Sequence, residues 1–148
     1  MITGVGLVCV YVLDYDEAYD FYVHKLGLSV GFDAPMEGGG RWLVLHAPDQ
    51  PEVPIMLTVP EPPLTSEENA AAIRQLMATG LLGPGALKTD DCRRDYKELS
   101  AKGVEFIQEP QDRPYGVEAL MRDNSGNWIV LVEPKEFTPA DFEGFDFG

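Results

Sequence analysis

The sequence is poor in the residues that most often hold metal ions or form disulfides. Its 148 residues include two histidines, His24 and His46, and two cysteines, Cys9 and Cys92. No H-x-x-x-H or C-x-x-C spacing occurs, which excludes a histidine-rich metal centre and gives no sign of a cysteine-based one. The cysteines fall in a predicted strand and a predicted helix, where we expect buried free thiols rather than a disulfide.

Basic residues are also scarce. Eleven Lys and Arg stand against 25 Asp and Glu, which gives a formal net charge of -14. A field of that sign repels phosphate and therefore argues against nucleic acid and anionic membranes as partners. The same charge favours a cationic ligand, although acidity also serves simply to keep a protein surface soluble.

Several sequence signals that would assign the chain to a known class are missing. No apolar run approaches the ~20 residues of a membrane span, and no basic region followed by an apolar stretch marks a secretory signal, so we expect a cytoplasmic protein. There is no G-x-S-x-G nucleophile elbow and no phosphate-binding loop. Hydrolase chemistry through a covalent intermediate and nucleotide binding are therefore not expected.

What the chain does contain is a repeated outline. Asp14 and Glu17 stand at capping-box spacing before an apolar stripe, and Gly27 follows where a helix C-terminus favours glycine. The same outline returns from Asp90 to Gly103, 76 residues later, with Asp90 or Asp91 as the cap. One amphipathic helix is thus predicted twice. Its apolar stripe is Ala18, Phe21, Tyr22 and Leu26 in the first copy, and Cys92, Tyr96 and Leu99 in the second.

Strand patterns surround both helices in the same order, which predicts an α+β protein made of two βαβββ modules. In the first module the strands are expected over 2–13, buried on both faces, and over 28–32, 41–46 and 53–59. In the second they are expected over 86–89, 104–108, 116–121 and 128–133, with a loop over 109–114. Between the modules, Thr65 and Glu68 predict a capped helix over 66–79.

The predicted organisation is one domain and a tail. The domain covers 1–134, with module one over 1–60, a linker helix segment over 61–83 and module two over 84–134. The acidic tail of 135–148 contains four phenylalanines. Such a segment either docks on the body or on a partner, or frays in solvent.

Three motifs in this order resemble the vicinal oxygen chelate superfamily, which includes glyoxalase I, bleomycin-resistance proteins and extradiol dioxygenases. The motifs are the paired βαβββ modules, "DFY" followed by "LG" within 20–27, and "RDNSGNWIVLVEP" over 122–134. The resemblance covers residues 1 to about 134, with Asn124 where the family commonly has proline. It implies that the two modules form a paired open β-cup, with helices outside and the site inside.

The resemblance also implies four metal-ligand positions, which enzymes of the family fill with His, Glu or Gln. In this chain they fall on Leu7, Met56, Pro84 or Gly85, and Val130. None of these can ligate a hard or borderline metal, since the thioether of Met56 is a soft and weak ligand. We therefore expect no metal and no other cofactor.

Strand alternation predicts which side chains line the cup instead. The expected lining is mainly apolar, and its aromatic rings could stack on a flat or cationic ligand. Val8, Val10 and Val12 are expected to face the helix. The predicted ligand-binding residues are Leu7, Cys9, Tyr11, Trp42, Met56, Thr58, Leu120, Trp128 and Val130.

Glu118 and His46 are the candidate catalytic residues. A carboxylate among apolar strand residues has a raised pKa if it is buried, and could then serve as a general base or as the counter-charge for a cation. The alternative is a carboxylate that is solvated or paired with Arg41, Arg113 or Arg122. His46 could act as an acid or base if it faces Glu118, or it could be an exposed turn residue.

These features favour a metal-free small-molecule-binding protein that sequesters a drug or metabolite, as the resemblance to bleomycin-resistance proteins implies. The resemblance also implies a homodimer. The alternative is a lyase, isomerase or dioxygenase of the same superfamily, acting through Glu118 without a metal or through unrecognised metal ligands. A third reading is a regulatory or interaction module that uses the tail as its contact.

Overall fold

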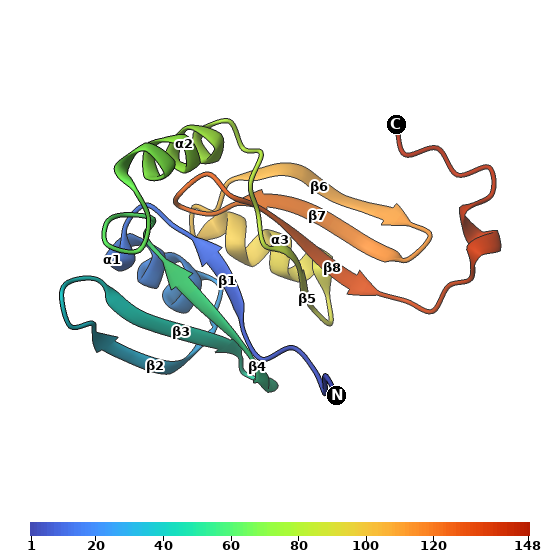
Figure 1. The fold of residues 1–148 in the computed structure, drawn as a ribbon. Helices are drawn as coiled ribbons and strands as arrows, with labels where there is room; N and C mark the ends of the chain where they lie inside the picture. The colour runs from blue at the N-terminus through green and yellow to red at the C-terminus, as the bar shows by residue number, and fades with distance from the viewer. The chain divides into compact units, whose positions relative to one another are not determined.

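The computed structural model describes residues 1–148 and divides them into two compact units. Unit 1 comprises Met1–Pro84 together with Asp123–Asn127, and unit 2 comprises Gly85–Arg122 together with Trp128–Gly148. Each unit contains one four-stranded mixed sheet, as Figure 1 shows. The chain is therefore α+β with two repeated βαβββ modules, as predicted.

In unit 1 the strand order is β1-β4-β3-β2, with β1 parallel to β4 and the other pairs antiparallel. A linker helix follows the last strand, and none of the chain's helices is long and apolar enough to cross a membrane. The elements are β1 (Val8–Tyr11), α1 (Tyr15–Tyr19), the π-helix η1 (Asp20–Lys25), β2 (Ser29–Pro35), β3 (Arg41–Ala47), β4 (Gln50–Thr58) and α2 (Glu67–Ala78).

The first helix begins where the sequence places its cap. The carboxylate of Asp14 accepts a hydrogen bond from the backbone N–H of Glu17 at 2.8 Å. After one α-helical turn the hydrogen bonds lengthen to π spacing, and the N–H of Leu26 donates to the carbonyl of Phe21. The predicted amphipathic helix is therefore present, but only its first turn has α-helical hydrogen bonds. The apolar stripe determines which side is buried, but not the spacing of the hydrogen bonds.

The core of unit 1 lies between the helix and one face of the sheet. The buried rings of Phe21 and Tyr22 come from the helix, and Val10 and Val12 come from β1 and the residue after it. The prediction that the valines of the first strand face the helix fits this core. The prediction that this strand is buried on both faces is wrong, because Leu7 is 45% exposed and Tyr11 is 39% exposed.

Unit 2 repeats this arrangement with strand order β5-β8-β7-β6. Asp91, one of the two predicted caps, accepts a hydrogen bond from the N–H of Arg94 at 2.9 Å and begins the helix. The elements are β5 (Gly85–Lys88), α3 (Cys92–Ala101), β6 (Phe106–Arg113), β7 (Gly116–Arg122), β8 (Trp128–Pro134) and the short 3₁₀ helix η2 (Pro139–Phe142).

Two of the edge strands, β2 and β6, are longer than the sequence predicts, whereas β1 is shorter than the predicted 2–13. β2 continues through Pro35, and β6 continues through Pro110 to Arg113, where we expected a loop over 109–114. Proline lacks the N–H that a strand interior needs, but it fits at an edge where that group has no partner. The strand order places β2 and β6 at the edges of their sheets.

Two smaller expectations also change. Ser66, rather than Thr65, caps α2 by accepting a hydrogen bond from the N–H of Asn69 at 3.1 Å. Both cysteines are free thiols, as expected, but Cys9 is exposed and only Cys92 is buried. Cys9 lies in β1 on the face opposite the helix, so the face that a strand residue occupies decides its burial.

Candidate functional site

The face of the unit 1 sheet opposite the helix, hereafter the open face of unit 1, brings together five of the six ligand-binding residues predicted in module one, while the sixth, Leu7, immediately precedes β1. Directly paired strand residues share a face of a sheet. Cys9 pairs with Met56, Met56 pairs with Val44, and Val44 pairs with Phe32. These four residues form one row across all four strands.

A second row on the same face contains two aromatic side chains. Tyr11 pairs with Thr58 on β4, and Trp42 pairs with Ala34 on β2. Leu57 on β4 pairs with Leu43 on β3. Thr58 follows Leu57 and Trp42 precedes Leu43, so Thr58 and Trp42 lie on the same face as each other. The side chains of Trp42 (44%) and Phe32 (56%) are exposed.

The polar groups of this face are largely satisfied within it. Thr58 is buried, and its hydroxyl oxygen accepts the Cys9 thiol at 3.4 Å. What remains accessible is carbon and aromatic surface. A sheet face that merely met water would carry polar side chains at these positions. A contiguous apolar surface of this kind marks a site for a ligand or a partner.

His46 lies toward the end of β3, two residues after Val44 on the open face of unit 1. It is half-buried, and its Nδ1 lies 2.8 Å from the carbonyl oxygen of Ala47. Glu118, its predicted partner, belongs to unit 2. The hydrogen bond to Ala47 therefore orients the imidazole locally.

The corresponding face of the unit 2 sheet, hereafter the open face of unit 2, carries the residues predicted in module two. Leu120 pairs with Val130, and Glu118 pairs with Val132 two residues away on the same face. Trp128 pairs with Arg122 at the other end of the two strands. All of these side chains are half-buried.

Glu118 is held in a polar cluster near the β6–β7 turn. Its carboxylate accepts a hydrogen bond from Nε of Arg113 at 2.9 Å and another from the hydroxyl of Tyr115 at 2.6 Å. The Arg113 and Glu118 side chains are 13% and 15% exposed. Of the sequence alternatives, pairing with Arg113 is the one the structure contains, so the carboxylate is charge-neutralised.

Burial and the adjacent Glu118 carboxylate together raise the pKa of Tyr115 to about 12. The phenol therefore keeps its proton at neutral pH and acts as the donor to Glu118. The cluster extends to Gln108, whose Oε1 accepts a hydrogen bond from Arg113 at 3.3 Å. Its amide nitrogen is buried and has no partner, which leaves an unused donor in the cluster.

Phe32 and Gln108 are the site residues that the sequence reasoning missed. The pairing of β2 with β3 shifts between Val30 and Phe32, so one extra residue reverses the alternation there. The register of β6 shifts on both sides of Gln108 in the same way. Gly31, which lies within the first shift, is the one sequence signal that could have indicated it.

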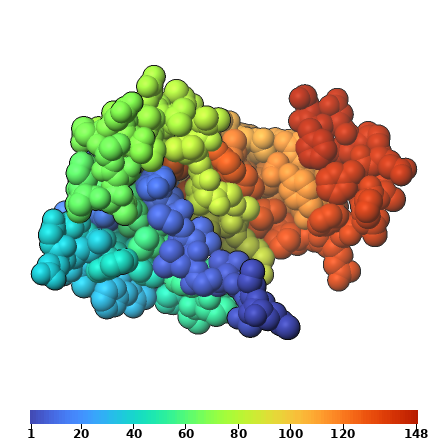
Figure 2. Space-filling view, in the orientation of Figure 1, coloured from blue at the N-terminus to red at the C-terminus, as the bar shows by residue number.

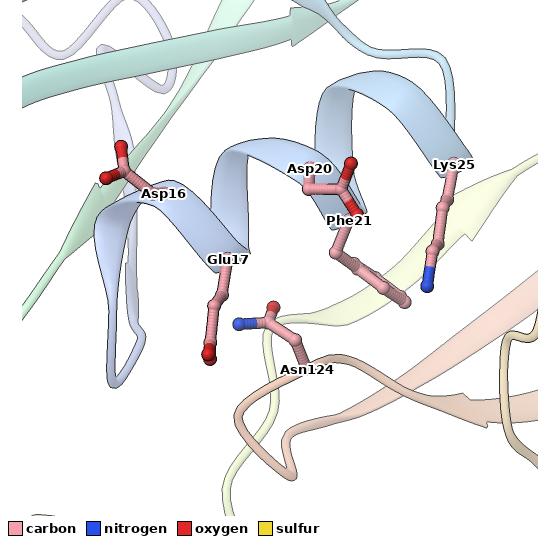
Figure 3. A pocket seen from close by; sticks show the side chains of 6 residues that line it. All are labelled: Asp16, Glu17, Asp20, Phe21, Lys25 and Asn124. Atoms are coloured by element: carbon pink, nitrogen blue, oxygen red, sulfur yellow. The ribbon is translucent and has the colours of Figure 1, made fainter.

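A separate groove of about 400 Å³ lies beside the first helix of unit 1. Figure 3 shows Glu17 pointing toward Asn124, while Asp16 points away to the other side of the helix. The remaining lining residues are Asp20, Phe21 and Lys25. Its carboxylates are exposed and its one aromatic ring is buried in the core, so the groove offers little aromatic surface for stacking.

The four positions where the family places metal ligands offer no suitable donors. Leu7 and Met56 lie in unit 1, and Gly85 and Val130 lie in unit 2. No group of three or more His, Cys, Asp or Glu side chains in the chain could hold a metal ion. The residues present therefore do not fit the metal centre of the family's enzymes.

Comparison with known proteins gives a consistent family assignment. The family model of the Glyoxalase/Bleomycin resistance protein/Dioxygenase superfamily matches residues 4–131. The crystal structure of UcmS2 is 42% identical, covers 90% of this chain and 99% of its own, and has a TM-score of 0.85. TnmS3, an antibiotic-binding protein from Streptomyces sp. CB03234, is 31% identical, covers 90% of this chain and 98% of its own, and has a TM-score of 0.70.

A protein of Shewanella frigidimarina (strain NCIMB 400) is 34% identical over 131 residues, which are 86% of this chain and 91% of its own length. The similarities run through both modules, and the family match ends three residues short of the end of β8. The chain belongs to the Glyoxalase/Bleomycin resistance protein/Dioxygenase superfamily.

Proposed function

We propose that this protein binds and sequesters a small, flat and largely apolar molecule without the help of a metal ion. The observation that carries the proposal is the open face of unit 1, where Tyr11, Phe32 and Trp42 remain exposed on an apolar surface. Flat aromatic ligands gain both burial and stacking from such side chains. The similarity to TnmS3, an antibiotic-binding protein, supports the binding of a small molecule.

The net charge of -14 supports a preference for cationic ligands. The proposal gives Glu118 no role as a general base, because Arg113 and Tyr115 already occupy both of its carboxylate oxygens. Leu120, Trp128 and Val130, on the open face of unit 2, enter the proposal as further ligand contacts.

A dye series tests the ligand class. Nile red is uncharged, acridine orange is a planar cation, and anilinonaphthalene sulfonate is an anion, so the three vary in charge while keeping a flat aromatic body. We expect acridine orange and Nile red to bind with saturation and the anion to bind at least tenfold more weakly. Equal binding of all three would contradict the charge preference, and no binding of any would contradict the proposal.

The two tryptophans allow the site to be located, because one lies in each unit. The single variants Trp42→Phe and Trp128→Phe each keep one tryptophan. The fluorescence of that tryptophan is quenched only by a dye bound near it. Trp42→Ala should raise the dissociation constant at least tenfold, which corresponds to about 1.4 kcal/mol. Leu64→Ala, which removes an exposed apolar side chain outside the site, is the matched control and should leave affinity unchanged.

Metal independence is tested by elemental analysis of untagged protein purified without chelator, and by thermal shifts over Ni, Zn, Mn, Fe(II) and Mg. We expect no stoichiometric metal and no stabilisation. A clear stabilisation at saturating metal would show that a metal binds the folded state and would redirect the assays to lyase and dioxygenase chemistry.

We further propose that the protein acts as a cytoplasmic homodimer. The exposed apolar open face of unit 1 supports association as well as ligand binding. Analytical ultracentrifugation with and without dye measures the oligomeric state directly. A protein that stays monomeric while binding dye would contradict the dimer without affecting the ligand proposal.

A further inference from the structure

The C-terminal tail of 135–148 lays aromatic rings against the polar cluster around Glu118. Phe142 stacks on Tyr115 with 6.1 Å between ring centroids and 26° between planes. The guanidinium carbon of Arg113 lies 5.5 Å from the ring centroid of Phe147. In Figure 2 the tail, coloured red, lies directly against the orange strands of the same unit. Phe137 completes the contact at the edge of Tyr115, with centroids 6.5 Å apart.

The tail contacts groups suited to holding a planar ligand. Tyr115 presents a flat ring, Arg113 presents a guanidinium face, and the amide nitrogen of Gln108 is an unused buried donor. Together these groups suit a planar aromatic molecule with a carbonyl-type acceptor at its edge. Leu120, the strand partner of Gln108, continues the surface into the apolar part of the open face of unit 2.

The tail lies outside the part of the chain that the family model matches. The family match ends at residue 131, and the tail contains no regular structure except the single turn of η2. Phe137 and Phe147 remain 52% and 50% exposed, so each uses only part of its surface for contact. Burial of these two rings therefore offsets only part of the entropy lost when the segment is ordered, which favours its displacement by a ligand.

We propose that Tyr115, Arg113 and Gln108 form a subsite for a planar aromatic group with a hydrogen-bond acceptor, and that Phe142 and Phe147 of the tail occupy it in the absence of ligand. The tail therefore acts as an intrachain competitor that the ligand must displace. This inference rests on the proposed function and specifies the chemistry of the ligand.

The first test needs no ligand. In the full chain, the double variant Phe142→Ala and Phe147→Ala should expose Tyr115 and lower its pKa from about 12 toward the ordinary value near 10. NMR of protein with ¹³C-labelled tyrosine rings measures this titration, with Tyr115→Phe identifying the signal. Leu64→Ala is the control and should leave the pKa unchanged. An unchanged pKa in the double variant would overturn the proposal.

The second test uses Nile red, which is planar, uncharged and carries a carbonyl oxygen. The double variant should bind Nile red at least threefold more tightly than the parent, and adding Gln108→Leu should cancel the gain. Unchanged or weaker binding in the double variant, or a gain that survives Gln108→Leu, would overturn the subsite while leaving the proposed function intact. Failure of both proteins to bind any of the three dyes would overturn the proposed function together with the subsite. Circular dichroism and thermal melts confirm that each variant is folded.

Discussion

At the scale of single residues, Asp123 organises the turn between β7 and β8. One carboxylate oxygen accepts the backbone N–H groups of Ser125 and Asn127 at 2.8 and 2.9 Å. The other accepts the hydroxyl of Tyr22 at 2.6 Å and the side-chain amide of Asn127 at 2.8 Å. The amide of Asn127 in turn donates to the carbonyl of Tyr11 at 2.7 Å. This turn therefore connects helix η1 and strand β1 of unit 1 through one buried carboxylate.

Replacing Asp123 with Ala should lower the free energy of unfolding by about 3 kcal/mol or more, because buried donors lose a charged acceptor. Urea denaturation followed by circular dichroism measures the change. Asn124→Ala in the same turn removes an exposed side chain and should stay within about 0.5 kcal/mol of the parent. Equal effects of the two substitutions would contradict the role given to Asp123.

A second residue-scale prediction concerns acid stability. Arg41 donates two hydrogen bonds to Asp33, at 2.7 and 2.8 Å, and these bonds hold the pKa of Asp33 below its usual value. Because the folded pKa is the lower one, the pair stabilises the fold above the unfolded value near 3.9, and this contribution is lost as pH falls through the folded pKa.

Arg41→Gln should therefore cost about 1 kcal/mol or less at pH 6, since both groups are partly exposed, and the difference from the parent should disappear at pH 2 to 3. Urea unfolding at several pH values makes the comparison. Arg74→Gln removes a more exposed ion pair with Glu67 and is the control, with an expected effect near zero. A cost for Arg41→Gln that stays constant down to pH 2 would rule out the assigned linkage.

At the scale of elements, the close approach of two backbones at the start of β7 requires a glycine. Gly116 begins β7 with φ 146°, and a Cβ there would overlap the carbonyl oxygen of Glu133 on the neighbouring strand. β7 and β8 are directly paired at this end, where Gly116 faces Pro134. Only a residue without a side chain permits that approach.

Gly116→Ala should destabilise the protein by more than about 2 kcal/mol, because the backbone of β8 has to move away. Thermal melts provide the readout, with Gly4→Ala as the control, since no atom lies within 4 Å of a Cβ at that position. The tail-bearing end of unit 2 should also loosen, which hydrogen exchange at β7 and β8 would detect. A melting temperature equal to that of Gly4→Ala would contradict the close approach.

The element scale also shows where sequence reasoning was sufficient. Capping residues located the starts of α1 and α3 to within one residue, at Asp14 and at Asp90 or Asp91, because a cap is a local interaction over three residues. The lengths of β2 and β6 were underestimated. Whether a strand tolerates Pro35 or Pro110 depends on its position at the edge of a sheet, and no local pattern encodes the strand order. The bulges in β2 and β6 change which face of the sheet the following side chains occupy. They too depend on pairing with a neighbouring strand, which no local pattern encodes.

At the scale of the whole molecule, the formal net charge of -14 sets the long-range field. Salt screens this field, since the Debye length falls from about 30 Å at 0.01 M to about 3 Å at 1 M. Raising sodium chloride over that range should weaken acridine orange binding several-fold and leave Nile red binding nearly unchanged. Fluorescence titrations at the two salt concentrations test this. An equal loss of affinity for both dyes would contradict an electrostatic contribution to binding.

The sequence by itself determined the two βαβββ modules, the apolar character of the open face of unit 1, and the motifs that resemble the family. The modules and the apolar face follow from hydrophobic periodicity, capping and turn residues, all of which act over a few neighbouring positions. Only the tertiary structure decided that Glu118 is neutralised by Arg113 and Tyr115, and that Phe142 of the tail stacks on that cluster. Those contacts depend on which strands pair and where bulges shift the register, so they arise only when distant segments pack together.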